Sequence, residues 1–364
     1  MDRNVALFKK CAQEMQLPYT YYPTADVLKV ELGAKPYYFV FSISPINYGA
    51  SIYVAKHKYA CNTLLHQAGF PVPKAVAFEK KKLEQHSLSE LIEPLRFPLV
   101  AKPMLNSVRG LGVLCNIKNI AELSEYVNTL FNNHRFVQIE EFHSQLKEYR
   151  VTVLNNKVIG VLIRTGAFVI GDGKHTIEEL IELKNVERIH LSKELTISPL
   201  RYDTEYKSCL EEQGLTLQSI VPEGNKIRLC YTVNTGRGGD IFSLGKKIHP
   251  ANAKMVCDAA RAIGLNYVGF DLLCEDIINT PFKPNKWIII EANFYADATL
   301  HEIPNHGVKT KIINKMLRHL IYRHPFSYLY HLCMHSCYSK YFKSGLLLLI
   351  LLFVINTIYM AQNS

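Results

Sequence analysis

A run of aliphatic side chains near residue 290 constrains the fold of this chain more than any other feature. The segment WIIIEANF covers residues 287–294, and consecutive aliphatic residues are typical of a strand that is buried on both faces. Glu291 and Asn293 follow the run two positions apart, so they lie on the same side of that strand. A buried carboxylate is costly unless a positive charge compensates it. Either the strand ends at the surface here, or the two residues hold a cation.

A second apolar stretch poses the same alternative. In VGFD, residues 268–271, Asp271 also follows apolar residues. Asp271, Glu291 and Asn293 are thus three oxygen donors at the predicted ends of two apolar strands. Mg²⁺ prefers oxygen ligands and usually shares them with nucleotide phosphates. We expect these residues to bind Mg²⁺, or Mn²⁺ in its place, rather than to be three unrelated polar residues at strand ends.

Charge and cysteine content narrow the class of protein. The chain has 364 residues, enough for two or three domains, and a formal net charge of +10, which favours an anionic partner such as a nucleotide or a membrane surface. Its Lys and Arg residues are spread along the chain, so we do not expect nucleic acid to be the partner. Nine cysteines without a disulfide-like spacing indicate a reducing compartment, and the charged N-terminal residues do not resemble a signal peptide.

An apolar stretch near residue 350 predicts a membrane anchor. Residues 345–361 contain no charged side chain over 17 positions, the lower limit for a helix that crosses a bilayer. Lys340 and Lys343 precede the stretch, so we expect the bulk of the protein at the cytoplasmic face of a membrane, held by a single-pass C-terminal tail anchor. The alternative is a C-terminal helix buried in the fold. Cys333 and Cys337 lie just before the stretch, where cysteines are either free or acylated.

Hydrophobic periodicity outlines a mixed fold of helices and strands. The spacing of apolar residues predicts helices in three segments, residues 4–16, 56–69 and 249–265. A strand is expected at residues 37–44, and short strands alternate with helices between residues 98 and 170. Within that region two β-rich runs flank NNK, residues 155–157, as in a hairpin. The pattern predicts an α+β fold with antiparallel sheets, not a regular doubly wound sheet.

A lysine and a glycine-rich segment form a candidate phosphate site. Lys102 ends a predicted strand, and NSVRGLGV follows at residues 106–113 with Ser107, Gly110 and Gly112. Glycines let the backbone approach a ligand closely, and successive N–H groups can surround phosphate oxygens. The segment lacks the Gly-Lys-Ser/Thr of a P-loop, and a plain turn is the alternative.

An acidic strand end forms a candidate nucleoside site. In VQIEEFHSQLKEYRV, residues 137–151, a strand leads through Glu140 and Glu141 into a linker. Such a linker between two lobes can present backbone groups and a carboxylate to an adenine. Glu148, eight residues after Glu140, is placed to accept hydrogen bonds from ribose hydroxyls. The alternative is an exposed acidic strand end.

The order of these elements resembles the ATP-grasp superfamily, and in particular the ATP-grasp module of cyanophycin synthetase and related amino-acid ligases. The similarity is carried by LHQAGFPVPKAV, VIGDGKHTIEELI, IHPANA, AIGLNYVGFDLL and IIIEANFYADATLHEIPNHG, and it extends over roughly residues 55 to 310. It implies an ATP-grasp fold, in which two α+β lobes hold ATP between antiparallel sheets. The expected organisation is an N-terminal segment at 1–55, the ATP-grasp domain at 56–315, a juxtamembrane segment at 316–344 and a transmembrane helix at 345–361.

The resemblance also implies roles in nucleotide binding. Lys58, in KHKYACNTLL, and Lys102 are implied to contact the ATP phosphates, with the glycine-rich segment closing over them. Glu140 and Glu141 are implied to lie at the adenine, and Glu148 near the ribose.

For the chemistry, the resemblance implies that Asp271, Glu291 and Asn293 hold Mg²⁺. Arg150 and Arg228 match basic positions of the module, and Arg228 is implied to steady the transferred phosphate. The implied reaction is ATP-dependent carboxylate–amine ligation through an acylphosphate, with an amino acid or peptide as substrate. A membrane-tethered nucleotide-binding pseudoenzyme and an ATP-grasp phosphotransferase are the alternatives.

Three positions depart from the family pattern. His57 replaces an acidic residue before the first lysine. NTGRGGD, residues 234–240, carries Arg237 in a loop that faces the substrate in the family, so Arg237 is expected to affect which carboxylate or amine is accepted. Phe294 and Tyr295 make the segment after Asn293 bulkier than in the family.

Overall fold

The computed structural model describes residues 1–104, 112–143, 145–192, 195, 197–283, 286–335, 337 and 339–362. It divides the chain into two compact units. The central unit is residues Ile46–Thr310, and the terminal unit joins Met1–Pro45 to Lys311–Ser364. The expected boundaries lay after residues 55 and 315, with the two ends of the chain in separate parts. In the structure the two ends fold together.

The terminal unit packs helices on a small antiparallel sheet. Its N-terminal half consists of α1 (Arg3–Glu14), β1 (Tyr19–Tyr22), β2 (Val27–Leu32) and β3 (Lys35–Val40). Its C-terminal half consists of α11 (Ile312–Arg323), α12 (Pro325–His335) and α13 (Ser339–Gln362). Phe8 of α1 packs against Phe39 of β3 with ring centroids 4.3 Å apart, and Met316, Leu317 and Leu320 of α11 are equally buried. The apolar faces of both halves therefore form one core.

The strand expected at residues 37–44 is shorter than predicted. β3 ends at Val40, because Phe41 adopts a positive φ of 51°, which an extended strand does not allow. The helix expected at 4–16 is confirmed as α1, whose first turn is capped by the Asp2 side chain accepting from the Asn4 N–H.

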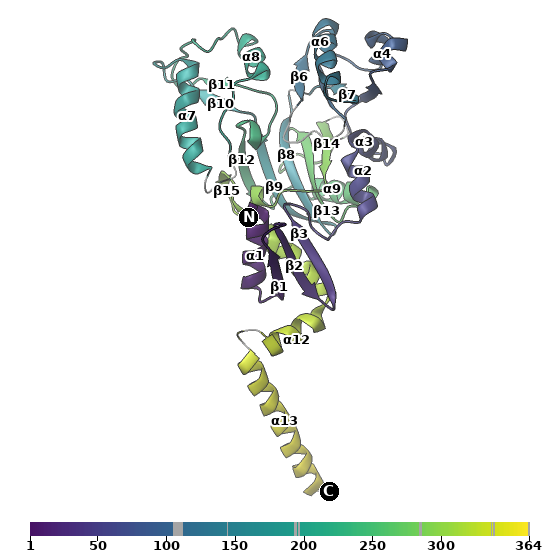
Figure 1. Ribbon diagram of the computed structural model, residues 1–364, viewed down its shortest axis with the longest axis vertical. Helices are drawn as coiled ribbons and strands as arrows, with labels where there is room; N and C mark the ends of the chain where they lie inside the picture. Colours follow the sequence, from purple (N-terminus) through teal and green to yellow (C-terminus); the bar gives the residue numbers. More distant parts are fainter. Residues whose placement is uncertain are drawn as a thin grey trace. The chain divides into compact units, whose positions relative to one another are not determined.

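The central unit contains two larger antiparallel sheets (Figure 1). The four-stranded sheet has the order β4 (Ala75–Glu79), β7 (Phe136–Glu141), β5 (Leu99–Pro103), β6 (Leu114–Ile117). Helices α4 (Lys82–Gln85), α5 (Leu88–Leu91) and α6 (Ile120–Phe131) belong to this lobe, and α6 packs its buried residues against β5, β6 and β7.

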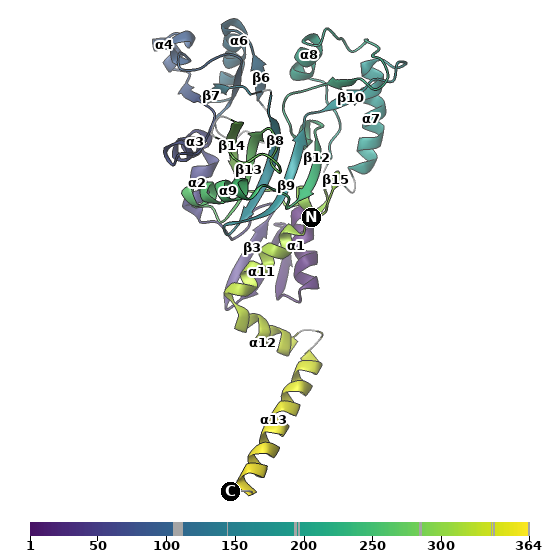
Figure 2. The same cartoon turned by 180° about the vertical axis from the view of Figure 1, so that it is seen from behind.

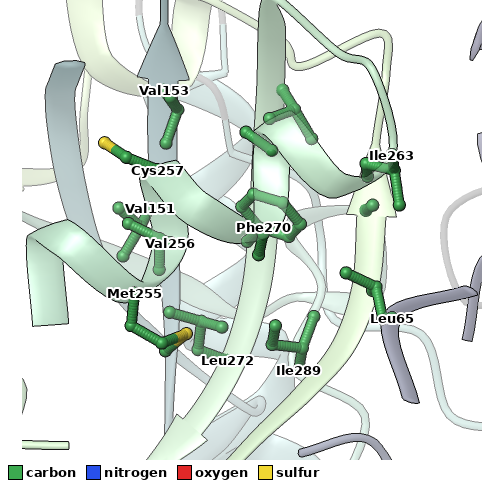
Figure 3. Packing of buried hydrophobic residues seen from close by; sticks show 14 of the residues in the cluster. Leu65, Val151, Val153, Met255, Val256, Cys257, Ile263, Phe270, Leu272 and Ile289 are labelled. Atoms are coloured by element: carbon green, nitrogen blue, oxygen red, sulfur yellow. The ribbon is translucent and has the colours of Figure 1, made fainter. Parts of the chain in front are cut away.

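The six-stranded sheet has the order β14 (Trp287–Asn293), β13 (Tyr267–Cys274), β8 (Lys147–Leu154), β9 (Lys157–Thr165), β12 (Asp240–Gly245), β15 (His306–Gly307). Only its last pair, β12 with β15, is parallel among the described strands. Helices α2 (Gly49–Lys56), α3 (Lys58–Gln67) and α9 (Pro250–Ala262) cover one face (Figure 2). Met255 and Val256 of α9 pack on Val151, Phe270 and Leu272 of the sheet (Figure 3). The helices expected at 56–69 and 249–265 are thus confirmed as α3 and α9.

Between β9 and β12 the chain builds a third, smaller lobe. It consists of α7 (Ile177–Leu191), α8 (Thr204–Glu211) and the two-stranded pair β10 (Phe168–Ile170) and β11 (Lys226–Arg228), with its own buried cluster. A short 3₁₀ turn, η1 (Thr235–Arg237), leads from it back into the large sheet, and α10 (Thr299–Glu302) packs on β9 and β12.

The predicted hairpin is confirmed as β8 and β9. Asn155 and Asn156 connect the strands with φ values of 45° and 61°. Asparagine tolerates positive φ better than other non-glycine residues, and a two-residue turn of this hand matches the twist of the flanking strands. The turn therefore fixes which residues of β8 and β9 lie opposite each other, and this register builds the site.

Candidate functional site

Asp271 is the centre of a buried charge cluster. Its Oδ2 accepts from Arg150 Nη2 at 2.8 Å and from Asn293 Nδ2 at 3.1 Å, and its Oδ1 contacts Arg150 Nε and lies 2.8 Å from Arg164 Nη1. The prediction that Asp271 ends its strand is wrong, because β13 continues to Cys274. The guanidinium groups compensate the buried carboxylate, so the strand does not need to reach the surface there.

Strand register explains why these residues meet. Asp271 lies opposite Arg150 of β8 on one side and opposite Glu291 of β14 on the other. Gly269, opposite Asn293, leaves room for the arginine, because a Cβ there would lie 2.9 Å from Arg150 Cδ. The cluster therefore forms on one face of three adjacent strands.

Glu291 and Asn293 lie in the last part of β14, as expected. Glu291 Oε1 is 3.1 Å from Lys58 Nζ, and about a third of the Glu291 side chain is exposed. Lys58 is the first residue of α3, so the helix that covers the sheet also delivers this cation to the strand end. Lys58 is thereby tied to the cluster through an interaction that sequence reasoning did not anticipate.

Arg164 was missed by sequence reasoning. It lies opposite Glu148 in the β8–β9 register, with Nη1 3.1 Å from Glu148 Oε1, and its Nη2 donates to the Val233 carbonyl. The hairpin turn at Asn155 and Asn156 contained the signal, because it places Glu148 and Arg164 on facing strands. Glu148, predicted near a ribose, is thus half of a buried ion pair.

The cluster separates the acidities of its two buried carboxyls. Burial raises the pKa of Asp271, but the charges of Arg150 and Arg164 outweigh burial and hold it well below its usual value. Burial raises the pKa of Glu148 to about 7, because the attraction of Arg164 is partly opposed by the negative charge of Asp271. The positive charge of Arg164 therefore stabilises chiefly the ionised carboxylate of Asp271.

We expect Glu148 to give the protein a distinct pH dependence. Its ordinary pKa is 4.5 and its pKa in the folded chain is about 7, so folding takes up a proton between these values. The free energy of unfolding contributed by Glu148 is therefore fully present below about pH 4.5 and is lost as the pH rises through about 7. Glu148→Gln removes this component, so the variant gains stability relative to wild type across that window.

Urea unfolding of metal- and nucleotide-free protein at a series of pH values measures this difference. Glu182→Gln, at an exposed position of α7, is the matched control and should track wild type throughout. If the Glu148→Gln and wild-type profiles run parallel from pH 5 to pH 8, the raised pKa is excluded.

Asp271, Glu291 and Asn293 suit a metal that arrives with its own ligands. They are three hard oxygen donors on one sheet face, but Asp271 already accepts from two guanidinium groups and an amide. In the part of the chain that the structure describes, no group of three or more His, Cys, Asp or Glu is arranged to hold a metal alone. The donors therefore fit a Mg²⁺ whose coordination is completed by phosphate oxygens and water.

Lys102 and Glu140 form a second buried pair, in the four-stranded sheet. Lys102 Nζ donates to Glu140 Oε1 at 2.6 Å, and Gln138 Nε2 donates to Glu140 Oε2 at 3.0 Å. All three side chains are almost completely buried. Gln138 was not predicted, although it lies directly opposite Lys102 on β7. Glu141 ends β7 and accepts from the Arg96 N–H at 3.2 Å.

The glycine-rich segment is described only in part. Ser107 and Gly110 lie outside the described residues. Gly112 has a φ of 71°, and a Cβ there would lie 3.0 Å from Pro103 Cγ, so glycine is needed for both reasons. The segment therefore returns into β6 close against the strand that carries Lys102.

Residues of the small lobe form ion pairs and hydrogen bonds with the NTGRGGD loop. Arg237 contacts Asp203 and lies 3.1 Å from Glu205 Oε2. Buried Arg188 of α7 donates to the Gly239 carbonyl at 3.2 Å and pairs with Asp240 at 2.7 Å. Arg237, expected to face a substrate, thus has its guanidinium engaged within the protein, and Arg188 is a positioning residue that sequence reasoning missed.

Arg228 does not contact Asp271 and interacts instead with side chains of the small lobe and the segment that follows it. Its Nη2 donates to Tyr231 Oη at 2.8 Å, its guanidinium lies over the Tyr231 ring, and Glu212 is 3.9 Å away. The side chain is 44% exposed, so part of it is accessible to a ligand. Its role at a transferred phosphate stays a prediction.

Comparison with known proteins finds relatives that are similar to the central part of this chain. A family model described as D-ala D-ala ligase C-terminus matches residues 64–189. Cyanophycin synthetase of Crocosphaera subtropica is 30% identical over 266 residues, which cover 72% of this chain and 30% of that protein. A glutathione biosynthesis bifunctional protein of Streptococcus agalactiae serotype V is 28% identical over 271 residues, covering 72% of this chain and 36% of the relative. The chain spans about a third of the length of these curated relatives.

The fold is shared with a solved structure. The crystal structure of a bifunctional glutathione synthetase from Pasteurella multocida matches with a TM-score of 0.61 and 23% sequence identity, over 89% of this chain and 44% of that one. The fold class expected from the sequence, α+β with two lobes of the ATP-grasp type, is confirmed. The chain belongs to the ATP-grasp superfamily, and its ATP-grasp region is similar to those of cyanophycin synthetase and the bifunctional glutathione synthetases.

Proposed function

We propose that this protein is an ATP-dependent carboxylate–amine ligase that forms an amide or peptide bond through an acylphosphate. The cluster around Asp271 is the observation that carries the proposal. It sets three carboxyl groups, of Asp271, Glu291 and Glu148, and the Asn293 amide beside three cations. Two of the cations, Arg150 and Arg164, come from the six-stranded sheet, and the third, Lys58, comes from α3. Such a site accepts a polyanion with its metal without leaving an isolated buried charge.

The proposed reaction uses this inventory without a covalent enzyme intermediate. The carboxylate of one substrate attacks the γ-phosphorus of ATP, ADP leaves, and an amine then displaces phosphate from the acylphosphate. Lys58 and Lys102 position the phosphates, Glu140 and Glu141 border the adenine, and the protein supplies orientation and fixed charge. Mg²⁺ held with the nucleotide by Asp271, Glu291 and Asn293 supplies neutralisation of the charge that develops on the phosphates.

The substrate class follows from the relatives only as a proposal. Cyanophycin synthetases and glutathione biosynthesis proteins are named for products built from amino acids, which supports an amino acid or small peptide as substrate here. Arg228 and the loop at residues 234–240 are the proposed substrate-side elements, with Arg228 steadying the transferred phosphate and Arg237 shaping the loop.

Release of ADP and phosphate by the full-length protein tests the activity. Mg²⁺-ATP is supplied with pools of amino acids and dipeptides, and release that depends on one pool supports a ligase, whose product is then sought by mass spectrometry. A phosphorylated substrate without amide product would instead identify a phosphotransferase. Binding of ATP without turnover on any pool would identify a nucleotide-binding pseudoenzyme and contradict the proposal.

Lys102 is expected to contribute strongly to ATP binding. Replacing it by Met removes a charge-assisted contact to phosphate and should weaken ATP by about 2 kcal/mol, roughly thirtyfold. Since Lys102→Met alone leaves Glu140 buried without its cation, Lys102→Met with Glu140→Gln is the informative variant. Calorimetric titration of Mg²⁺-ATP into both variants and wild type gives the affinities. Wild-type affinity in the double variant would exclude Lys102 from the phosphate site.

We also propose that the protein is anchored to a membrane by α13. The helix from Ser339 to Met360 is long and apolar enough to cross a bilayer, and none of its window is buried within the structure. That exposure favours an anchor over the alternative of a buried C-terminal helix. Lys340 and Lys343 at its start support the cytoplasmic face as the location of both units.

A further inference from the structure

Helix α12 presents an apolar stripe that the described residues of the terminal unit leave exposed. Phe326 is 85% exposed, Tyr330 64%, Leu329 51% and Met334 42%. These positions recur at intervals of three and four residues, so they form one face of the helix. Four large apolar side chains on one exposed face need a partner.

The opposite face of α12 is fixed to the terminal unit. Ser327 Oγ accepts from the Gly33 N–H at 2.7 Å, and Tyr328 Oη donates to the Met15 carbonyl at 2.6 Å. His324, just before the helix, shares a hydrogen bond of 2.5 Å with Tyr37 Oη. The apolar stripe is therefore held outward by contacts to three different N-terminal elements, and it cannot turn inward without breaking them.

Charge identifies the kind of partner. From Lys311 to Lys343 the chain carries six Lys and Arg residues and neither Asp nor Glu. These cations flank α12 on both sides, in α11 and at the start of α13, whereas α12 itself carries the exposed Phe, Tyr and Leu side chains. Basic residues on either side of an exposed apolar helix face suit the surface of an anionic membrane. A second copy of this chain offers no complementary acidic segment within the same region.

The short connection between α12 and α13 also favours a membrane as the partner of α12. Only three residues separate His335, the end of α12, from Ser339, the start of α13. Four extended Cα–Cα steps span at most about 14 Å. If α13 crosses the bilayer from Gly345 onward, its first turn lies among the headgroups, and the end of α12 lies within about 14 Å of that layer.

We propose that α12 is an interfacial helix, whose Phe326–Met334 stripe inserts below the headgroups of an anionic bilayer and seats the terminal unit on it. The proposal rests on the membrane anchor proposed above. It adds a second contact with the membrane, since a spanning helix alone leaves the soluble part free to rotate about a single connection.

Quenching of tryptophan emission by brominated lipid tests the insertion. Full-length Phe326→Trp is reconstituted into vesicles of phosphatidylcholine and phosphatidylglycerol, with or without bromine on the upper part of the acyl chains. We expect the emission added by Trp at position 326 to be largely lost in brominated vesicles. Wild type, whose one tryptophan, Trp287, is fully buried, and Tyr202→Trp, at a 48% exposed position of the central unit, should keep their emission.

Flotation of the same vesicles separates the two membrane proposals. Protein that floats without quenching at position 326 overturns the interfacial helix and leaves the anchor intact. Protein that does not float overturns the anchor and the interfacial helix with it. Emission at position 326 that shifts to the blue without bromine quenching shows that a protein surface covers the stripe, and this also overturns the proposal.

Discussion

Replacing Glu291 by Gln is expected to reduce turnover about 1000-fold while the chain stays folded, which corresponds to about 4 kcal/mol of lost transition-state stabilisation. The amide keeps the size of the side chain but cannot offer a charged oxygen to the metal. Because the Glu291 side chain is about one-third exposed and, among the residues that the structure describes, forms an ion pair with Lys58 alone, its loss should cost little stability. The rate of ADP release with the substrate pool that supports turnover, beside a thermal unfolding curve, measures both effects.

Glu275→Gln is the matched control for this variant. Glu275 follows β13 directly, is 44% exposed and pairs with Lys286 at 2.6 Å, so it is a carboxylate of similar exposure away from the cluster. We expect its turnover to equal that of wild type. Full activity in Glu291→Gln would refute the assignment of Mg²⁺ to this carboxylate.

Arg150→Met is expected to lower the free energy of unfolding by about 3–5 kcal/mol, because it leaves the buried negative charge of Asp271 only partly compensated. Arg150 makes two contacts to Asp271, and both side chains are no more than 10% exposed. Methionine fills the volume but leaves Arg164 as the one cation that pairs with Asp271 in the described part of the chain. Chemical denaturation without metal and nucleotide measures the loss, and it should be accompanied by a rise in the pKa of Asp271.

Arg135→Met tests whether the loss of stability in Arg150→Met comes from burial of the ion pair or from ion pairing alone. Arg135 pairs with Glu79 at 3.4 Å, but its side chain is 78% exposed. A surface pair of this kind contributes no more than about 1 kcal/mol. Equal losses in Arg135→Met and Arg150→Met would show that the cluster around Asp271 has no special stabilising role.

The features that local sequence predicted well depend on neighbouring residues. The Asn155–Asn156 turn has a conformational preference of its own, and it fixed the β8–β9 hairpin. Helix α9 follows from its apolar spacing, and Pro250 at its first position reinforces its start. Glu291 and Asn293 were placed on one face of a strand by the alternation of side chains alone.

What sequence could not reveal depends on pairing between distant strands. Asp271 was expected at a strand end because a buried carboxylate without a visible partner is unfavourable. Its partners Arg150 and Arg164 come from the hairpin more than 100 residues earlier, and only the order of strands in the sheet brings them together. The union of the two chain ends in the terminal unit is long-range in the same sense, since α1 and α11 each show only an amphipathic pattern.

The terminal unit also sets an order of events during synthesis. Its N-terminal half leaves the ribosome first, with the apolar faces around Phe8, Leu28 and Phe39 ready for burial. The helix that packs against α1, α11, is made only after the whole central unit, and α13 begins at Ser339, after α12. The nascent chain therefore carries an unfinished apolar surface until α11 has been made, and the long apolar helix α13 follows soon after that surface is completed.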